Sequence, residues 1–223
     1  MSARNVLLAF PLFLAACKNT PLTPPRVVAT NFDGEAVGAL PAHWKAGSTH
    51  ASGADASWSV RADASAPSAP NVLAMTKANS SSEGTFNVCW TDAMTLQEGA
   101  IEVRLRADGG EADQGGGVVW RVQGMNDYYV CRYNPLESNF RVYVVIAGDR
   151  RQLATATVPG DGKGWHLLRV EHALGHVVCT LDGATKLEAQ DDTLPHVGGL
   201  GLWTKADACT SFDDLKVTPV ETR

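Results

Sequence analysis

The feature that most constrains the fold is a long series of short segments in which apolar and β-branched residues alternate with polar ones. This period of two is typical of half-buried strands, and no stretch has the 3.6-residue period of a long amphipathic helix. Residues that favour turns separate the segments, and those at 173–175 and 182–183 are typical of hairpins because each contains a glycine. The pattern predicts an all-β sandwich. The clearest strands are expected at residues 100–106, 117–123, 128–133, 140–147, 165–172, 176–181, 199–204 and 212–217.

Composition limits the number of domains and the classes of partner. The chain has 223 residues, of which 44% are hydrophobic and 19% charged, as expected for an ordinary globular protein. We expect one β-sandwich domain at residues 27–220, with an Ala-, Ser- and Pro-rich surface loop at residues 63–70. The net charge of -5 and the scattered basic residues do not provide the positive patch that nucleic acid requires, so no nucleic-acid partner is expected.

The N-terminus predicts export and lipidation. A short apolar run that follows Arg4 ends in Leu14-Ala15-Ala16-Cys17, and it is too short to span a bilayer as a helix. We expect residues 1–16 to be a cleaved signal peptide and Cys17 to carry the lipid, with residues 17–26 as a proline-rich tether. Lys18 at the next position favours the outer membrane. The prediction is a cell-envelope lipoprotein, periplasmic or surface-facing, that contacts the membrane only through its anchor.

Four further cysteines remain, at positions 89, 131, 179 and 209. In an oxidising compartment they permit three pairings. Cys131 and Cys179 lie in the middle of predicted strands, so free core thiols are as consistent with the pattern as bridges. No two of the four have the spacing of a zinc knuckle.

Polar and aromatic residues are densest between positions 113 and 143. Aromatic rings stack on sugar rings, and Arg, Asn and Glu side chains bind sugar hydroxyls, so this mixture suits carbohydrate. Strand alternation places Tyr128, Val130 and Arg132 on one face, and Arg141 and Tyr143 on one face of the next strand. The alternative is that the aromatics are core residues and the charged side chains form cross-strand pairs.

Several ordered blocks resemble one bacterial family. DQGGGVVWR, NDYYVCRYNPLESNFRVY, WHLLRVE, GLGLWTKAD and FDDLKV are similar to the laminin-G-like family labelled the 3-keto-disaccharide hydrolase domain, or loosely family-16 glycoside hydrolases. The resemblance implies a concanavalin/laminin-G-like jelly-roll β-sandwich with carbohydrate as its partner. By this likeness the candidate contacts are Trp120, Arg121, Tyr128, Arg132, Asn134, Glu137, Arg141, Trp203 and Lys205.

The chain departs from the family-16 glucanases, whose Glu-x-Asp-x-x-Glu signature is missing here. Ordinary glycoside hydrolysis needs two carboxyl groups at a fixed separation, whereas elimination from a 3-keto sugar needs mainly one base and one electrophile. We therefore assign Glu137 as the base of such an enzyme, with Arg121 or Arg132 beside the oxyanion. An enzyme should shield Glu137 from water. A noncatalytic glycan-binding module should have an open aromatic groove with its carboxylates apart or paired to Arg, and a structural envelope lipoprotein an apolar patch.

No cofactor is implied, and metal sites have weak support. His172 and His176 flank a turn but lack a third ligand for zinc. Asp213 and Asp214, read with Asp33, could hold a structural calcium ion; the favoured alternative is that they accept hydrogen bonds from backbone amides. The glycine run 115–117 has neither the lysine nor the helix of a phosphate loop, so we interpret it as a bulge or a close approach of backbone.

Overall fold

The structure is a computed structural model that describes residues 26–51, 55–77, 83–160 and 163–220. These residues form strands and connecting loops, and none of the described segments is a helix that could span a membrane. The strands are β1 (Val28–Thr30), β2 (Trp44–Thr49), β3 (Ser57–Ala62), β4 (Asn71–Lys77), β5 (Phe86–Leu96), β6 (Gly99–Gly109), β7 (Gly116–Gly124), β8 (Asp127–Asn134), β9 (Asn139–Ile146), β10 (Asp149–Thr157), β11 (His166–Ala173), β12 (His176–Leu181), β13 (Thr185–Gln190), β14 (Gly198–Lys205) and β15 (Cys209–Pro219). The predicted signal peptide, Cys17 and most of the tether lie outside the described residues.

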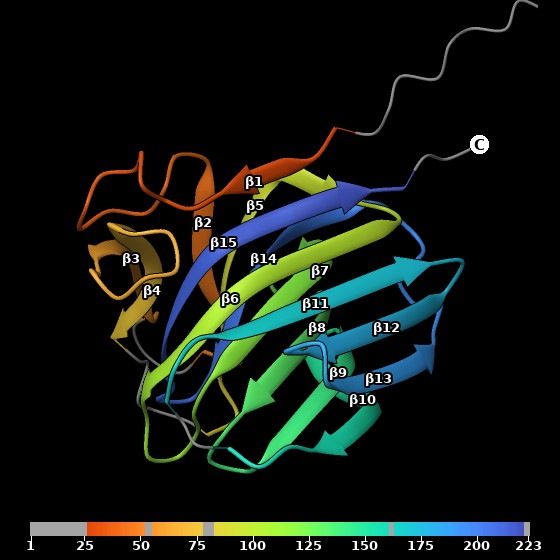
Figure 1. The fold of residues 1–223 in the computed structure, drawn as a ribbon. Coiled ribbons are helices and arrows are strands. Elements are labelled where there is room, and N and C mark those ends of the chain that lie inside the picture. Colours follow the sequence, from red (N-terminus) through yellow and green to blue (C-terminus); the bar gives the residue numbers. More distant parts are fainter. Residues whose placement is uncertain (1–25, 52–54, 78–82, 161–162, 221–223) are drawn as a thin grey trace, which may run out of the picture.

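The strands form two antiparallel sheets that stack on one another (Figure 1). The eight-stranded sheet has the order β13-β12-β11-β6-β15-β4-β3, with β1 also paired to β15. The seven-stranded sheet has the order β10-β9-β8-β7-β14-β5-β2. All eight segments predicted from the sequence are strands, and the all-β sandwich is confirmed.

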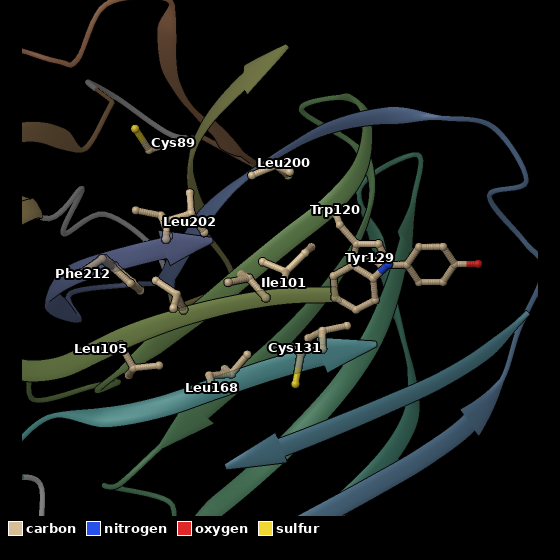
Figure 2. Packing of buried hydrophobic residues seen from close by; sticks show 14 of the residues in the cluster. Cys89, Ile101, Leu105, Trp120, Tyr129, Cys131, Leu168, Leu200, Leu202 and Phe212 are labelled. Carbon is tan, nitrogen blue, oxygen red and sulfur yellow. The ribbon is translucent and has the colours of Figure 1, made fainter. Parts of the chain in front are cut away.

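The main core lies between the two sheets. Alternate residues of each strand point into it, so Trp120 and Cys131 of one sheet meet residues such as Leu168 and Phe212 of the other (Figure 2). The rings of Trp120 and Tyr129 stack with centroids 5.4 Å apart. The indole Nε1 of Trp120 donates a 2.9 Å hydrogen bond to Nδ1 of His172, which gives the buried indole N–H an acceptor inside the core.

A second apolar cluster covers the other face of the seven-stranded sheet, and all of its strand residues belong to that sheet. Its members are Phe86, Val88, Val119, Val122, Tyr128, Val130, Tyr143, Val145 and Trp203. These residues alternate with those of the main core, as the period of two requires. The seven-stranded sheet therefore buries apolar side chains on both faces.

The seven-stranded sheet curls strongly around this second cluster. β2 and β8 are separated by β5, β14 and β7, which in a flat sheet would place them about 19 Å apart. Yet the Thr49 hydroxyl of β2 lies 3.0 Å from the Tyr128 hydroxyl of β8. At the β9–β10 turn, Nε2 of His50 lies 2.9 Å from the carbonyl oxygen of Gly148. We call the face inside this curl the concave face.

Two sequence predictions about glycines are confirmed. The hairpin turns have positive φ angles at Leu174 and Gly175 (51° and 74°) and at Asp182 and Gly183 (53° and 67°). In the 115–117 run, a Cβ on Gly117 would lie 1.8 Å from the carbonyl oxygen of Cys131, so the run is a close approach of β7 to β8.

The cysteines of the core are free thiols, which is one of the two alternatives, disulfide bridges being the other. Cys89, Cys131 and Cys179 are fully buried free thiols. Burial raises the pKa of the Cys131 thiol, which also contacts the Cys179 thiol of the opposite sheet. These three residues pack as small apolar side chains.

Candidate functional site

At one end of the concave face, charged and amide side chains meet in a group that we call the polar corner. Its charged members are Asp113, Arg132, Glu137, Arg141 and Lys205. Arg132 of β8 and Arg141 of β9 are cross-strand partners, and Glu137 lies in the loop between these strands. Asp113 precedes β7, and Lys205 ends β14. Three strands and two loops therefore converge on the corner.

Arg132 is the buried centre of the polar corner, with 2% of its side chain exposed. Its Nη2 donates to Oε2 of Glu137 at 2.9 Å, and its Nη1 lies 4.0 Å from Oδ1 of Asp113. Its Nε and Nη1 are buried without a hydrogen-bond partner. Unpaired buried donors are rare, so this guanidinium retains capacity for an acceptor that the described residues do not supply.

Glu137 lies at the mouth of the corner, with 40% of its side chain exposed. Its backbone N–H donates to Oδ1 of Asn134 at 3.0 Å, and its Oε2 also accepts a 2.9 Å hydrogen bond from Nδ2 of Asn139. Burial alone would raise the pKa of Glu137, but the hydrogen bonds from Asn139 and Arg132 lower it to about 2. A carboxylate with so low a pKa stays ionised and is a weak base at neutral pH.

Asp113 is a member of the site that the sequence did not single out. Its side chain is 1% exposed; Oδ1 accepts from Nδ2 of Asn134 and Oδ2 from Nζ of Lys205, each at 2.8 Å. Burial raises the pKa of this carboxyl, against the effects of Lys205 and Arg132. The only sequence signal was its place at the start of the polar block, next to the glycine run.

The aromatic residues assigned to sugar stacking are buried. Tyr128 and Trp203 lie on the concave face, and Tyr128 shares it with Val130 as strand alternation predicted, but both aromatics are buried members of the second apolar cluster. Arg150 of β10, which no sequence signal identified, lies over the rings of Phe86 and Tyr143, with its Cζ atom 5.0 and 4.3 Å from their centroids. The packing alternative therefore describes these aromatics, and the corner offers polar groups instead of an open aromatic groove.

Two candidate residues do not belong to this site. Trp120 points into the main core on the opposite face of its sheet, so its assignment to carbohydrate is corrected to a packing role. Arg121 has a φ of 50° where the pairing of β7 with β8 becomes irregular, and its guanidinium donates to the carbonyl oxygens of Gln97 and Leu194. The prediction that Arg121 lies beside an oxyanion is therefore wrong, and its side chain instead holds two loops through their carbonyl oxygens. Arg132 keeps its contact with Glu137.

The residues considered for metals are engaged in other contacts. His172 is buried against Trp120, whereas His176 is exposed with its Nε2 3.3 Å from Oε2 of Glu188. The favoured alternative for the aspartates matches their contacts: Asp33 accepts from the Asn71 amide, and Asp213 from the amides of Ser68 and Asp214. Among the described residues no group of three or more His, Cys, Asp or Glu is arranged to hold a metal.

No protein-family profile and no curated protein sequence matches this chain. Solved structures match its fold at low sequence identity. The carbohydrate binding module CBM66 from Bacillus subtilis has 14% identity and a TM-score of 0.61, over 78% of this chain and 95% of that one. The cellulose induced protein Cip1 has 13% identity and a TM-score of 0.59, over 88% and 100% of the chains. A Bacillus subtilis protein with a galectin-like fold has 11% identity and a TM-score of 0.53, over 78% and 88%. The chain therefore has the fold of the jelly-roll β-sandwiches.

Proposed function

We propose that this protein binds carbohydrate at the polar corner and does not cleave it. The observation that carries the proposal is Arg132, a buried guanidinium with two unpaired nitrogens beneath the exposed side chains of Glu137 and Arg141. Sugar hydroxyls are both acceptors and donors, so they match a site that offers guanidinium and carboxylate groups together. The structural neighbours named a carbohydrate binding module and a cellulose induced protein support this class of ligand.

The electrostatics of Glu137 favour binding over catalysis. Oε2 already accepts hydrogen bonds from Arg132 and Asn139, and the low pKa leaves little basicity for removing a proton from carbon. The enzyme hypothesis requires that Glu137 be shielded from water, but its side chain is 40% exposed. Carboxylates paired to Arg are what a glycan-binding module predicts.

The second candidate is cleavage of a 3-keto-disaccharide or related glycoside. The observation that favours it is that Asp113 and Glu137 flank the same guanidinium while their pKa values shift in opposite directions. Such a division is typical of an acid and a base that share one site. In this scheme Glu137 is the base and Arg132 stabilises the enolate oxygen.

Proton NMR of the purified protein with oligosaccharides and their 3-keto derivatives separates the candidates. Our proposal predicts broadened ligand signals without new products, and the same result with a Glu137→Gln variant on the 3-keto substrates. Product signals that disappear in Glu137→Gln would replace our proposal with the enzyme. Product formation that persists in this variant would exclude Glu137 as the base, and silence across the panel would favour a structural protein.

We also propose that the domain is attached to the outer membrane through lipid on Cys17. The support is the Leu14-Ala15-Ala16-Cys17 sequence and the proline-rich stretch that follows it. Cys17→Ala should move the protein from the membrane fraction to the soluble fraction, since one acylated terminus is its only expected anchor. Cys89→Ala serves as the control, because Cys89 is buried in the core. Equal membrane fractions for Cys17→Ala and the unaltered protein would contradict this proposal.

A further inference from the structure

Positive charge exceeds negative charge on the concave face, although the chain as a whole has a net charge of -5. The two carboxylates of the polar corner, Asp113 and Glu137, lie among four cationic side chains. These are Arg132, Arg141, Arg150 and Lys205. Pairing both carboxylates therefore leaves two positive charges without a partner.

Two of these guanidinium groups have buried donor nitrogens without a hydrogen-bond partner. Arg132 has buried Nε and Nη1 atoms without a partner, and Arg150 has a buried Nη1 atom in the same condition. Arg150 lies against the Phe86 and Tyr143 rings, which attract its charge but do not accept a conventional hydrogen bond. Arg132 therefore has two donor nitrogens beyond the one that binds Glu137, and Arg150 has one buried nitrogen without an acceptor.

The cations also repel one another. Burial lowers the pKa of the Arg150 guanidinium, and the positive charges of Arg132 and Arg141 lower it further. Repulsion between partly buried charges is weakly screened by solvent and salt. An anionic group placed among them would relieve it.

Arg141 is the cation best able to meet a ligand at the surface. Its side chain is 32% exposed and its Nη1 lies 3.8 Å from Oε2 of Glu137. Its other contacts are long: Nε donates to the Thr155 hydroxyl at 3.2 Å and Nη1 to the Tyr143 hydroxyl at 3.4 Å. Such contacts are weak enough to be exchanged for an incoming oxyanion.

We propose that the carbohydrate bound at the polar corner is acidic, with a carboxylate or sulfate group placed among Arg132, Arg141 and Arg150. This inference rests on the proposed function and specifies its ligand class. The anionic oxygens accept hydrogen bonds from the partly exposed Arg141 guanidinium, and their charge offsets the local excess of positive charge. The sugar ring then meets Glu137 at the mouth of the corner.

The test is calorimetric titration of the purified protein with matched oligosaccharide pairs. Oligogalacturonates and alginate oligosaccharides are compared with their methyl-esterified or carboxyl-reduced forms, and sulfated oligosaccharides with their desulfated forms. We expect binding of one or more acidic members, at least tenfold weaker binding of the neutral counterpart, and weakening between about 20 and 200 mM salt. The class of acid that binds distinguishes carboxylate from sulfate.

Arg141→Gln should lower the affinity for the acidic ligand by about tenfold, as expected for loss of one charge-assisted hydrogen bond. Arg141→Lys should restore part of the affinity. The matched control is Arg169→Gln on the eight-stranded sheet, because Arg169 has a similarly exposed side chain (35%) and contacts two carboxylates, and this variant should bind as the unaltered protein does.

Three outcomes would overturn the inference, and they are distinguishable. Equal affinity for acidic and neutral partners would remove the acidic specificity but leave carbohydrate binding in place. No binding of any acidic or neutral member would remove both the inference and the proposed function. An equal loss in the Arg141→Gln and Arg169→Gln variants would place the ligand elsewhere and overturn the inference as well.

Discussion

The chemistry of Glu137 follows from its immediate partners. Two hydrogen bonds, from Arg132 and Asn139, converge on one carboxylate oxygen and lower the pKa of the group to about 2. The other two nitrogens of the Arg132 guanidinium, Nε and Nη1, have no hydrogen-bond partner. At this scale the site is a guanidinium that is only partly neutralised, and this incomplete pairing is what makes it a candidate for ligand binding.

The pH dependence of stability tests this local arrangement. The folded pKa of Glu137 is below its ordinary value of 4.5, so the ionised carboxylate stabilises the fold above pH 4.5, and this contribution is lost as the pH falls towards 2. Because the side chain is partly exposed, we expect Glu137→Gln to lower the free energy of unfolding by only about 1 kcal/mol at pH 7.

Urea unfolding at pH 7 and pH 3 measures the difference between the two proteins. The difference should shrink at pH 3, because Glu137 is then largely protonated in the unfolded chain but still ionised in the folded protein, so part of its contribution is already lost. A loss of the same size at both pH values would show that packing, not ionisation, explains the effect of Glu137→Gln.

Individual side chains were only partly predictable from the sequence. Alternation correctly placed Tyr128 and Arg132 on one face, because the period of two holds throughout β8. It could not show that Tyr128 is covered, since the covering residues Thr49 and Phe86 come from distant strands. It also could not predict the φ of 50° that redirects Arg121.

At the scale of strands, the glycine run sets how closely β7 approaches β8. Gly117 is the cross-strand partner of Arg132, so the close approach lies directly beside the polar corner. Any Cβ at position 117 would overlap the Cys131 carbonyl. The run therefore supports the site through the backbone and not by binding phosphate.

Replacing Gly117 tests this role. Gly117→Ala should lower the free energy of unfolding by about 2 kcal/mol, because the two strands must separate to accommodate the methyl group. Gly109→Ala is the matched control, since Gly109 also lies in a strand but a Cβ there would meet nothing within 4 Å. Equal effects of the two substitutions in chemical denaturation would contradict the close-approach interpretation.

Asp191, directly after β13, joins the edges of the two sheets. Its side chain accepts a 2.6 Å hydrogen bond from the Tyr129 hydroxyl and a 2.7 Å hydrogen bond from Arg151, both on the seven-stranded sheet. Burial alone would raise the pKa of Asp191, but the hydrogen bonds from Tyr129, the Thr193 amide and Arg151 lower it to about 2.

Asp191→Asn should lower the free energy of unfolding by about 2 kcal/mol, since hydrogen bonds to a buried charge are lost. Asp192→Asn, at the exposed neighbouring position, should change it little. Thermal or urea unfolding of the two variants makes the comparison. Similar stability of both would mean that Asp191 does not join the sheets.

Strands in the interior of the sheets were easier to predict from the sequence than strands at the sheet edges. All eight clear segments became strands, whereas the four strands at the ends of the two sheet orders, β13, β3, β10 and β2, were not among them. An edge strand is exposed on one side and carries polar residues such as those of β10 (DRRQLATAT), so its apolar alternation is weak. The interior strands β4 and β5 and the short strand β1 were also missing from the predicted segments. The pairing of β5 with β14 is interrupted by an irregularity.

At the scale of the whole molecule, the curl of the seven-stranded sheet decides where a ligand can reach. The curl brings β2 and β5 over to β8 and β10, and the enclosed aromatics close most of the concave face. The polar corner retains partly exposed charged groups, Glu137 and Arg141 among them. The sequence predicted an all-β sandwich, but not this closure, because it depends on contacts between strands far apart in the sheet order.

Stability without metal is a further expectation for the whole molecule. Asp33, Asp213 and Asp214 accept hydrogen bonds from amides and a serine hydroxyl, so they are already satisfied without calcium. EDTA should leave the melting temperature unchanged, and added calcium should not raise it. A decrease in EDTA that calcium reverses would restore the calcium site at these aspartates.

The central claim is that carbohydrate binds at the polar corner of the concave face. The most direct measurement is a two-dimensional amide NMR titration of the purified protein with the acidic oligosaccharides. We predict that shifted resonances cluster at residues 132–141, Asp113, Arg150 and Lys205. Shifts confined to the outer face of the eight-stranded sheet, around Arg169 or Arg106, would contradict the account.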